Sequence, residues 1–198
     1  MLKVIFIHSN INVNKLAKQV LKKEPKIIKR YPPTALDGKY TDGSTQLGLK
    51  SLTSRFSHFN VLKWWGTRSL RKSIRKGYET YNDIRGTPLY VQCWANVMRR
   101  GEQIRPHQHT KDPHTDGERY LCGNINVQVD GSTSTYYEGQ PVLNKNGLMS
   151  FFSANTFHWT DRYEGNDERI TIAFDIYNKE FYEHTVPSFF NKHHWVKI

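Results

Sequence analysis

The sequence predicts an α+β fold whose core is a sandwich or barrel of short antiparallel strands. Apolar residues recur with a helical period in the first 88 residues, and the period changes to two from residue 89 onward. Gly, Asn and Asp separate the later strand candidates. At 198 residues the chain suits one domain. We expect a layer of one strand, helices and loop over 1–88, a strand core over 89–178 and a tail over 179–198.

The first 88 residues predict one strand and two helices. Residues 2–7 form the strand candidate. Asn12 should cap a helix whose apolar stripe recurs at helical spacing and which Pro25 should end. Thr67 should cap a second helix, and Gly, Pro, Ser and Thr over 31–60 predict a long loop between the two. The apolar face of the second helix is expected at Leu70, Ile74, Tyr78 and Tyr81.

Five segments alternate as strands do. They are residues 89–98, 121–129, 133–137, 148–152 and 169–177. On the last of them Ile170, Ile172, Phe174 and Ile176 share one face, while Arg169, Thr171, Ala173 and Asp175 share the other. An arginine at the start of a packed strand is costly to desolvate unless it meets an anion, and its planar fork matches a carboxylate.

The net charge of +11, from 29 Lys and Arg against 18 Asp and Glu, favours polyanionic or acidic partners. No nucleic-acid-binding motif accompanies this charge, so nucleic acid is not the favoured partner.

The two cysteines, Cys93 and Cys122, lie in apolar runs and predict buried thiols in a reducing compartment. No apolar run has the length of a signal peptide core or a membrane span, so we expect a soluble cytoplasmic protein with no membrane partner.

His107 and His109 flank one glutamine just before a strand candidate. In an extended segment residues i and i+2 point the same way, so the two imidazoles can reach one metal ion. A third histidine, His158, follows the strand candidate at 148–152. An HxH pair alone is weak evidence for a metal site, and the third histidine strengthens that evidence.

Together these residues resemble a known family. The pattern W-x-N-x-M-x-x-G-x-x-I-x-P-H-x-H runs from Trp94 to His109, G-L-x-x-F-x-x-x-x-x-H runs from Gly147 to His158, and R-I-x-I-A-F follows Gly165. This looks like the Fe(II)- and 2-oxoglutarate-dependent oxygenases, in their prolyl-hydroxylase-like microbial and phage branch. The resemblance covers roughly residues 89 to 178 and implies a double-stranded β-helix (jelly-roll) barrel with N-terminal helices packed on one sheet.

The resemblance also implies site residues and cosubstrates. His107 and His158 would bind Fe(II), and Arg169 would form an ion pair with the far carboxylate of 2-oxoglutarate. O2 would be the second cosubstrate. Asn96 faces the same side of its strand as Trp94 and could line the cofactor pocket.

The sequence departs from the family pattern at position 109. The family's common motif is HxD, and His109 stands where the carboxylate is expected. Three readings follow: His109 is the third iron ligand, Asp112 or Asp116 supplies a carboxylate instead, or the site has lost its iron. The cupins also match Gly101, His107 and His109, but they would leave Arg169 without a role.

The favoured function is hydroxylation of a protein or small-molecule substrate. The alternative is a non-catalytic jelly-roll binding or structural protein, virion-associated if the chain is of phage origin. An assembly partner would then bind the basic surface or the aromatic tail, FYEHTVPSFFNKHHW. Demethylation of a nucleic acid drawn in by the positive charge is a third hypothesis.

Overall fold

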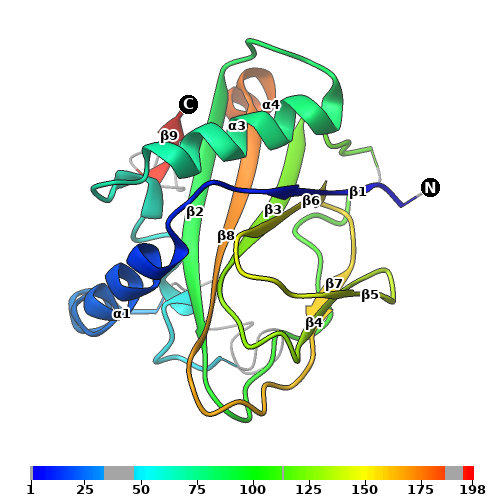
Figure 1. The fold of residues 1–198 in the computed structure, drawn as a ribbon. Helices are drawn as coiled ribbons and strands as arrows, with labels where there is room; N and C mark the ends of the chain where they lie inside the picture. Colours follow the sequence, from blue (N-terminus) through cyan, green and yellow to red (C-terminus); the bar gives the residue numbers. More distant parts are fainter. Residues whose placement is uncertain (1, 34–46, 113, 186–193) are drawn as a thin grey trace.

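The structure, a computed structural model, describes residues 2–33, 47–112, 114–185 and 194–198. It confirms the mixed class of helices and antiparallel strands (Figure 1). The elements are β1 Val4–His8, α1 Val13–Arg30, the short 3-10 helices η1 Thr53–Arg55 and η2 Val61–Lys63, α3 Arg68–Asn82, β2 Leu89–Met98, β3 Tyr120–Gln128, β4 Ser134–Tyr137, β5 Gln140–Leu143, β6 Leu148–Ser153, β7 His158–Thr160, β8 Arg169–Asn178, α4 Lys179–Thr185 and β9 Val196–Lys197.

The strands form two antiparallel sheets. The larger has six strands in the order β1-β6-β3-β8-β2-β9, and the smaller has three in the order β5-β4-β7. Strands β1 and β9 come from outside the 89–178 core and join the larger sheet at its two edges. No strand pairing joins the two sheets among the described residues, so the expected barrel is not closed. The architecture is a jelly-roll-like sandwich.

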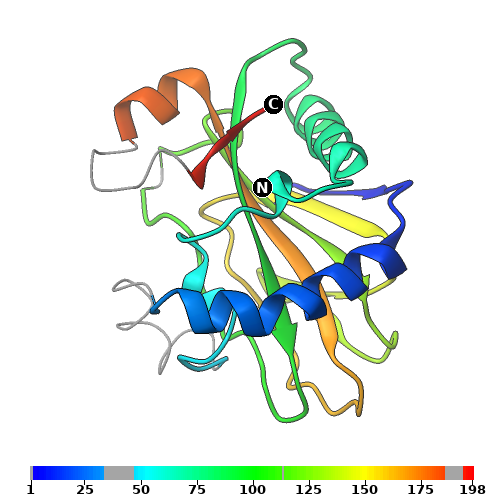
Figure 2. The same cartoon turned by 90° about the vertical axis from the view of Figure 1, so that its left-hand side faces the viewer.

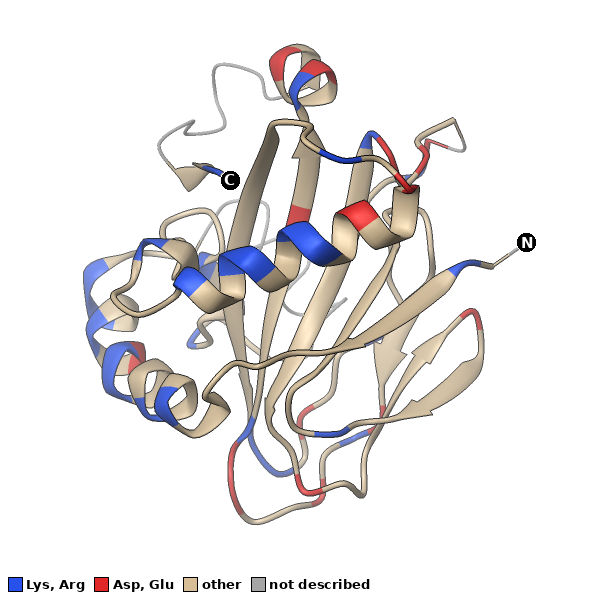
Figure 3. Cartoon of the chain, turned by 45° about the horizontal axis from the view of Figure 1, so that its top comes forward, with Lys and Arg blue, Asp and Glu red and all other residues tan. Residues whose placement is uncertain are grey.

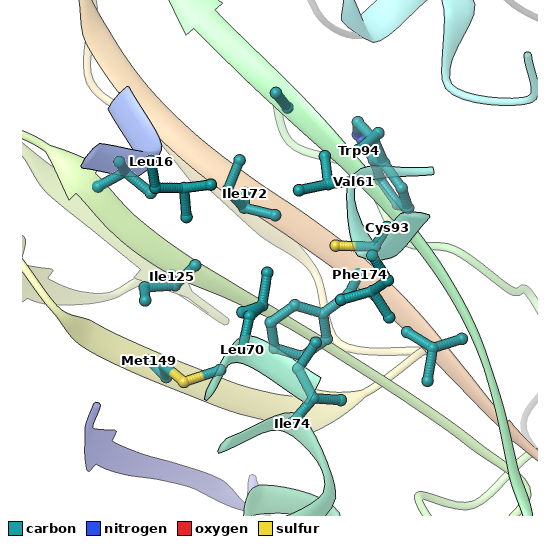
Figure 4. Packing of buried hydrophobic residues seen from close by; sticks show 14 of the residues in the cluster. Leu16, Val61, Leu70, Ile74, Cys93, Trp94, Ile125, Met149, Ile172 and Phe174 are labelled. Carbon is teal, nitrogen blue, oxygen red and sulfur yellow. The ribbon is translucent and has the colours of Figure 1, made fainter. Parts of the chain in front are cut away.

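Alternation along β2 and β8 divides the larger sheet into two chemically different faces. One face is apolar and packs against α1 and α3, as the side chains in Figure 4 show. Leu16 of α1 and Leu70 and Ile74 of α3 contact this face, where Cys93 and Phe174 lie. The other face of β2 and β8 lines a cavity between the sheets. The helix face over 70–81 and the buried, unpaired state of both cysteines are confirmed.

The predicted end of the first helix at Pro25 is wrong. Helix α1 continues through Pro25 to Arg30. Proline removes one backbone hydrogen bond of the helix, but burial of Ile27 in the core favours continuation. The backbone of Tyr31 then closes the helix by donating to the carbonyl of Ile27.

The predicted loop over 31–60 is described only in part, because residues 34–46 lie outside the described residues. From residue 47 the segment contains η1 and leads into η2. It is anchored by the fully buried Leu52 and by Arg55, whose guanidinium donates to the carbonyls of Tyr31 and Ser51. This part of the predicted loop is therefore packed against β2 and does not extend into solvent.

Gly77 of α3 faces the core, where an added Cβ would overlap the ring of the fully buried Phe151. We expect Gly77→Ala to destabilise the protein by about 1–3 kcal/mol, because overpacking outweighs the roughly 1 kcal/mol gain in helix propensity. The exposed Thr80 of the same helix is the matched control. Urea unfolding should show a loss for Gly77→Ala and no loss for Thr80→Ala. Equal or higher stability of Gly77→Ala would show that the contact with Phe151 is not tight.

None of the helices in the described ranges has the length and hydropathy of a membrane-crossing segment.

Candidate metal centre

Backbone hydrogen bonds hold the segment around the HxH pair in an extended form beside β7. His107 and His158 form an isolated antiparallel bridge, in which each backbone N–H donates to the carbonyl of the other, at 3.2 and 2.9 Å. The backbone N–H of His109 donates to the carbonyl of Ala154 at 2.8 Å. Residues 104 and 160 add a further hydrogen bond of 2.9 Å. The smaller sheet is thus extended by the segment that carries His107 and His109.

This arrangement brings the three predicted histidines together. One ring nitrogen from each of His107, His109 and His158 lies within 4.8 Å of the others. The ring centroids are 5.5 Å apart for His107 and His109, 4.2 Å for His107 and His158, and 5.2 Å for His109 and His158. The three rings can therefore contact one small ion at the same time.

Hydrogen bonds at Nδ1 determine which ring nitrogen is free. The Nδ1 atom of His107 lies 2.8 Å from the carbonyl oxygen of Arg105, and that of His158 lies 3.0 Å from the carbonyl oxygen of Thr156. A carbonyl oxygen only accepts, so both Nδ1 atoms carry the proton and both Nε2 atoms keep a lone pair. The Nδ1 atom of His109 lies 2.7 Å from Oδ1 of Asp175. Three Nε2 atoms with fixed tautomers form a donor set suited to a divalent transition metal.

Asp175 of β8 is a site residue that the sequence reasoning missed. Its carboxylate is surrounded by donors: the Nδ1–H of His109, the hydroxyl of Tyr120 at 2.9 Å and the thiol of Cys122 at 3.2 Å. Its side chain is only 10% exposed. His109, Cys122 and Asp175 also have ligand atoms close enough for a metal. Direct hydrogen bonds already join them, however, so we interpret Asp175 as the support of His109.

The electrostatic surroundings separate His109 from the other two histidines. Burial and, to a smaller extent, the neighbouring His109 lower the pKa of His107 to about 4. Burial also places the pKa of His158 well below its usual value, with His107 and His109 adding to the effect. Burial alone would lower the pKa of His109, but the charge of Asp175 and its hydrogen bond raise it. Two of the three rings therefore stay neutral and ready to bind a metal at mildly acidic pH.

These shifts predict how the stability of the metal-free protein depends on pH. The folded pKa values of His107 and His158 lie below the unfolded value of 6.5, so the unfolded chain takes up these two protons first as pH falls. His109 has the opposite sign, because the stability it contributes is present below 6.5 and is lost as pH rises through its folded pKa. The contribution of His109 therefore changes only above 6.5, and the fall in stability expected between roughly pH 6.5 and pH 4 comes from His107 and His158. Urea unfolding should show a smaller fall for His158→Gln than for wild type, and equal falls would contradict the assignment.

The two aspartates named as alternative ligands lie elsewhere. Asp112 and Asp116 are exposed, and both accept hydrogen bonds within their own turn. Asp112 accepts from the backbone of His114 at 2.9 Å and from the hydroxyl of Thr115 at 3.0 Å, while Asp116 accepts from the backbone of Arg119 at 2.9 Å. Neither aspartate belongs to the groups of potential ligands that converge among the described residues.

Arg169 is buried at the start of β8, with 2% of its surface exposed. Its Nη1 atom lies 3.0 Å from the sulfur of Met98, a weak acceptor, and its Nε atom has no hydrogen-bond partner among the described residues. No carboxylate of the described residues lies within ion-pair distance of it. Desolvation lowers its pKa to about 10, so the guanidinium is still charged at neutral pH. A buried charge of this kind favours the binding of an anion.

The histidines and Arg169 share one cavity of about 950 Å³. Asn96 also lines this cavity, but its amide is engaged inside the protein: it accepts from the hydroxyl of Thr53 at 2.7 Å and lies 3.4 Å from that of Thr171. Trp94, Thr171 and Ala173 complete the wall from the larger sheet. Gly165, which the resemblance singled out, is packed so closely against Tyr163 that a Cβ would clash.

No protein-family model matches this sequence, and no curated protein sequence matches it either. Solved structures do match its fold. A viral collagen prolyl hydroxylase of Paramecium bursaria Chlorella virus-1, in complex with 2OG, aligns with a TM-score of 0.58 at 11% identity, covering 87% of this chain and 94% of that one. A Pseudomonas putida prolyl-4-hydroxylase aligns with a TM-score of 0.53 at 9% identity, covering 89% and 92%.

A third match has a different activity. The epimerase SnoN of nogalamycin biosynthesis, in complex with Fe3+, alpha ketoglutarate and nogalamycin RO, aligns with a TM-score of 0.55 at 10% identity and covers 88% of this chain and 78% of that one. At such identities the likeness shows the fold alone. This chain therefore has the jelly-roll-like fold found in the 2-oxoglutarate-dependent oxygenases.

Proposed function

We propose that the protein is an Fe(II)- and 2-oxoglutarate-dependent oxygenase that hydroxylates a protein or small-molecule substrate. One observation carries the proposal: a cluster of three histidines and a buried arginine with no carboxylate partner in the described chain line the same cavity. The fold likeness supports it, because one matched structure contains 2OG and another contains iron with alpha ketoglutarate.

In this proposal His107, His109 and His158 would hold the iron through Nε2. Iron bound there would supply the chemistry that couples decarboxylation of a 2-oxo acid to oxidation of a substrate by O2. The hydrogen bonds at Nδ1 keep each ring in its ligating tautomer before the metal arrives.

Asp175 accounts for the departure from HxD. A carboxylate ligand would bring one negative charge to the metal, whereas a neutral imidazole brings none. The carboxylate of Asp175 lies 2.7 Å behind the ring of His109, so the charge is retained one hydrogen bond further out. A carboxylate that accepts from a ligating histidine also raises the basicity of that ligand.

Arg169 is placed to bind the far carboxylate of 2-oxoglutarate. Arg169 and Asp175 lie six residues apart on the same face of β8, about 20 Å along the strand. This span is measured along the backbone, and the long side chain of Arg169 and the histidine cluster line one cavity between these positions. A dicarboxylate bound in that cavity could therefore contact the guanidinium with its far carboxylate and the histidine cluster with its other end.

The rest of the cavity is available to a substrate. A volume of about 950 Å³ is near the upper end of the range for ligand pockets and exceeds what a five-carbon dicarboxylate needs. Phe56, Trp94, Phe152 and Trp159 give the cavity an aromatic lining that an apolar part of a substrate could contact. Trp159 is stacked on Tyr136, with ring planes 2° apart, and this pair stiffens the wall formed by β4 and β7.

Conversion of 2-oxoglutarate to succinate tests the proposed function. With Fe(II) and O2, the wild-type protein should form succinate above the level of His158→Ala, even without the main substrate. A chelator should abolish the difference. Equal, background succinate from both proteins would reject the oxygenase assignment.

A further inference from the structure

Almost all of the net charge of the chain lies on two helices. Helices α1 and α3 carry twelve Lys and Arg against two Glu, while the whole chain has a net charge of +11. Glu24 is buried and paired with Arg99 at 2.8 Å, and Glu79 is paired with Arg75 at 3.4 Å. The exposed surface of the helices is therefore nearly free of unpaired negative charge. In Figure 3 blue bands predominate along both helices, with little red. We call this surface the basic face; its exposed members are Lys15, Lys18, Lys22, Lys26, Lys29, Arg30, Arg68, Lys72 and Lys76.

The basic face lies away from the cavity. Both helices pack on the apolar face of the larger sheet, and the cavity lies on the opposite face of β2 and β8. Helix α3 crosses over this sheet in Figure 1, and α1 lies across its lower part in Figure 2. None of the cations of α1 or α3, both described in full, lines the cavity. A polyanion on the basic face would therefore be held at a distance from the proposed iron site.

A solvent-exposed aromatic ring lies between the N-terminal ends of the two helices. Trp65, in the turn before α3, is 79% exposed, the highest value among the exposed large apolar side chains of the described residues. The side-chain amide of Gln19 donates to the backbone carbonyl of Trp65 at 3.2 Å, which links the turn to α1. The ammonium group of Lys15 lies 4.4 Å from the ring centroid. A cavity of about 260 Å³, lined by Trp65, Lys15 and the start of α3, separates the helices here.

We propose that the basic face and Trp65 bind single-stranded nucleic acid. Single-strand binding surfaces combine a positive track for the phosphates with aromatic rings on which unpaired bases stack. Helix α1 is about 27 Å long, enough for its row of cations to follow several phosphates. This binding is independent of the oxygenase chemistry and would tether the protein while leaving the cavity open.

Two other anionic partners fit the surface less well. An anionic membrane would require several apolar side chains on the same surface, but α1 and α3 expose no large apolar residue besides the neighbouring Trp65. An acidic protein would match the cations and leave the flat ring without a partner. Duplex nucleic acid hides the faces of its bases, so the ring specifically favours single strands.

Fluorescence anisotropy with labelled oligothymidylate, oligouridylate and the matching duplex tests the proposal at low and physiological salt. Wild type should bind the single strands more tightly than the duplex. Trp65→Ala should weaken single-strand binding about 5- to 100-fold and remove the preference, whereas Trp65→Phe should keep most of it. The salt dependence should be unchanged in Trp65→Ala, because the phosphate contacts remain.

Charge variants separate the phosphate contacts from the stacking. Lys18→Gln, Lys22→Gln and Lys26→Gln combined should reduce the slope of log affinity against log salt by about 2, since each lost phosphate contact removes about 0.7. A matched control removes three exposed cations elsewhere, at Lys50, Arg85 and Lys145, and should bind like wild type. Circular dichroism checks that each variant is folded. No binding at low salt, equal loss in the control, unchanged binding by Trp65→Ala, or preference for anionic phospholipid vesicles would overturn the proposal.

Discussion

Replacing Arg169 by leucine should weaken 2-oxoglutarate binding about 30-fold or more while leaving the fold intact or more stable. Removing a guanidinium that pairs with a ligand carboxylate in a desolvated pocket costs about 2–5 kcal/mol of binding, because the carboxylate is left buried without a partner. Without ligand, the same guanidinium is a buried charge whose described partners include no carboxylate. Leucine removes the cost of burying that charge, so the free energy of unfolding should stay the same or increase.

Titration calorimetry under anaerobic conditions measures the first effect, and urea unfolding of the ligand-free protein measures the second. Arg169→Lys is the conservative comparison: it keeps the charge but loses the planar fork, so its affinity should lie between wild type and leucine. Unchanged 2-oxoglutarate affinity in Arg169→Leu would show that the arginine does not contact the cosubstrate. Loss of folding would instead assign it a structural role.

Asp175→Asn should weaken metal binding about 10- to 100-fold, because it removes the negative charge behind His109 and replaces one of the two acceptor oxygens, which three donors now share, by an NH2 donor. Competition with a chromophoric chelator, using Co(II) in place of Fe(II), measures this directly. Tyr120→Phe removes one donor to the same carboxylate but leaves its charge. That variant should bind metal within a few-fold of wild type, which serves as the control for packing changes near Asp175.

A second substitution tests whether Asp175 acts through His109. His109→Asp creates the HxD pattern and removes the imidazole that hydrogen-bonds to Asp175. In this background Asp175→Asn should weaken metal binding much less than it does in the His109 background, because no ligating histidine remains for Asp175 to support. The same chelator competition measures both losses. Equal losses in the two backgrounds would contradict a role of Asp175 that runs through His109.

The elements that could be predicted are those whose side chains alternate or recur over many residues. β2 and β8 are ten residues each, and both of their faces are largely buried, so apolar and functional residues separate cleanly between them. This is why Arg169 could be assigned to a pocket-facing position. β7 has only three residues and β5 is mostly exposed, so neither leaves a periodic signal. β7 is defined by its pairing with β4 and with His107, which lies fifty-one residues before it.

The site was predicted where the residue types themselves carry the chemistry. His107, His109 and His158 were identified, and the structure brings them together, but their role as metal ligands is still a proposal. Asp175 was placed on the correct face of its strand and was given no role. Its function depends on a contact with His109, sixty-six residues away, which only the register of β8 between β2 and β3 creates. The sequence feature that could have identified Asp175 as a site residue is a carboxylate on a strand whose two faces are both predicted to be packed.

Anaerobic titration with Fe(II), followed by 2-oxoglutarate, tests the central claim most directly. Wild type should bind one equivalent of iron and, on addition of 2-oxoglutarate, develop a weak visible charge-transfer band. The band should be absent in His158→Ala and retained in His114→Ala, which removes an exposed histidine from the neighbouring turn. No iron uptake and no band in wild type, or a band that persists in His158→Ala, would contradict a three-histidine iron site.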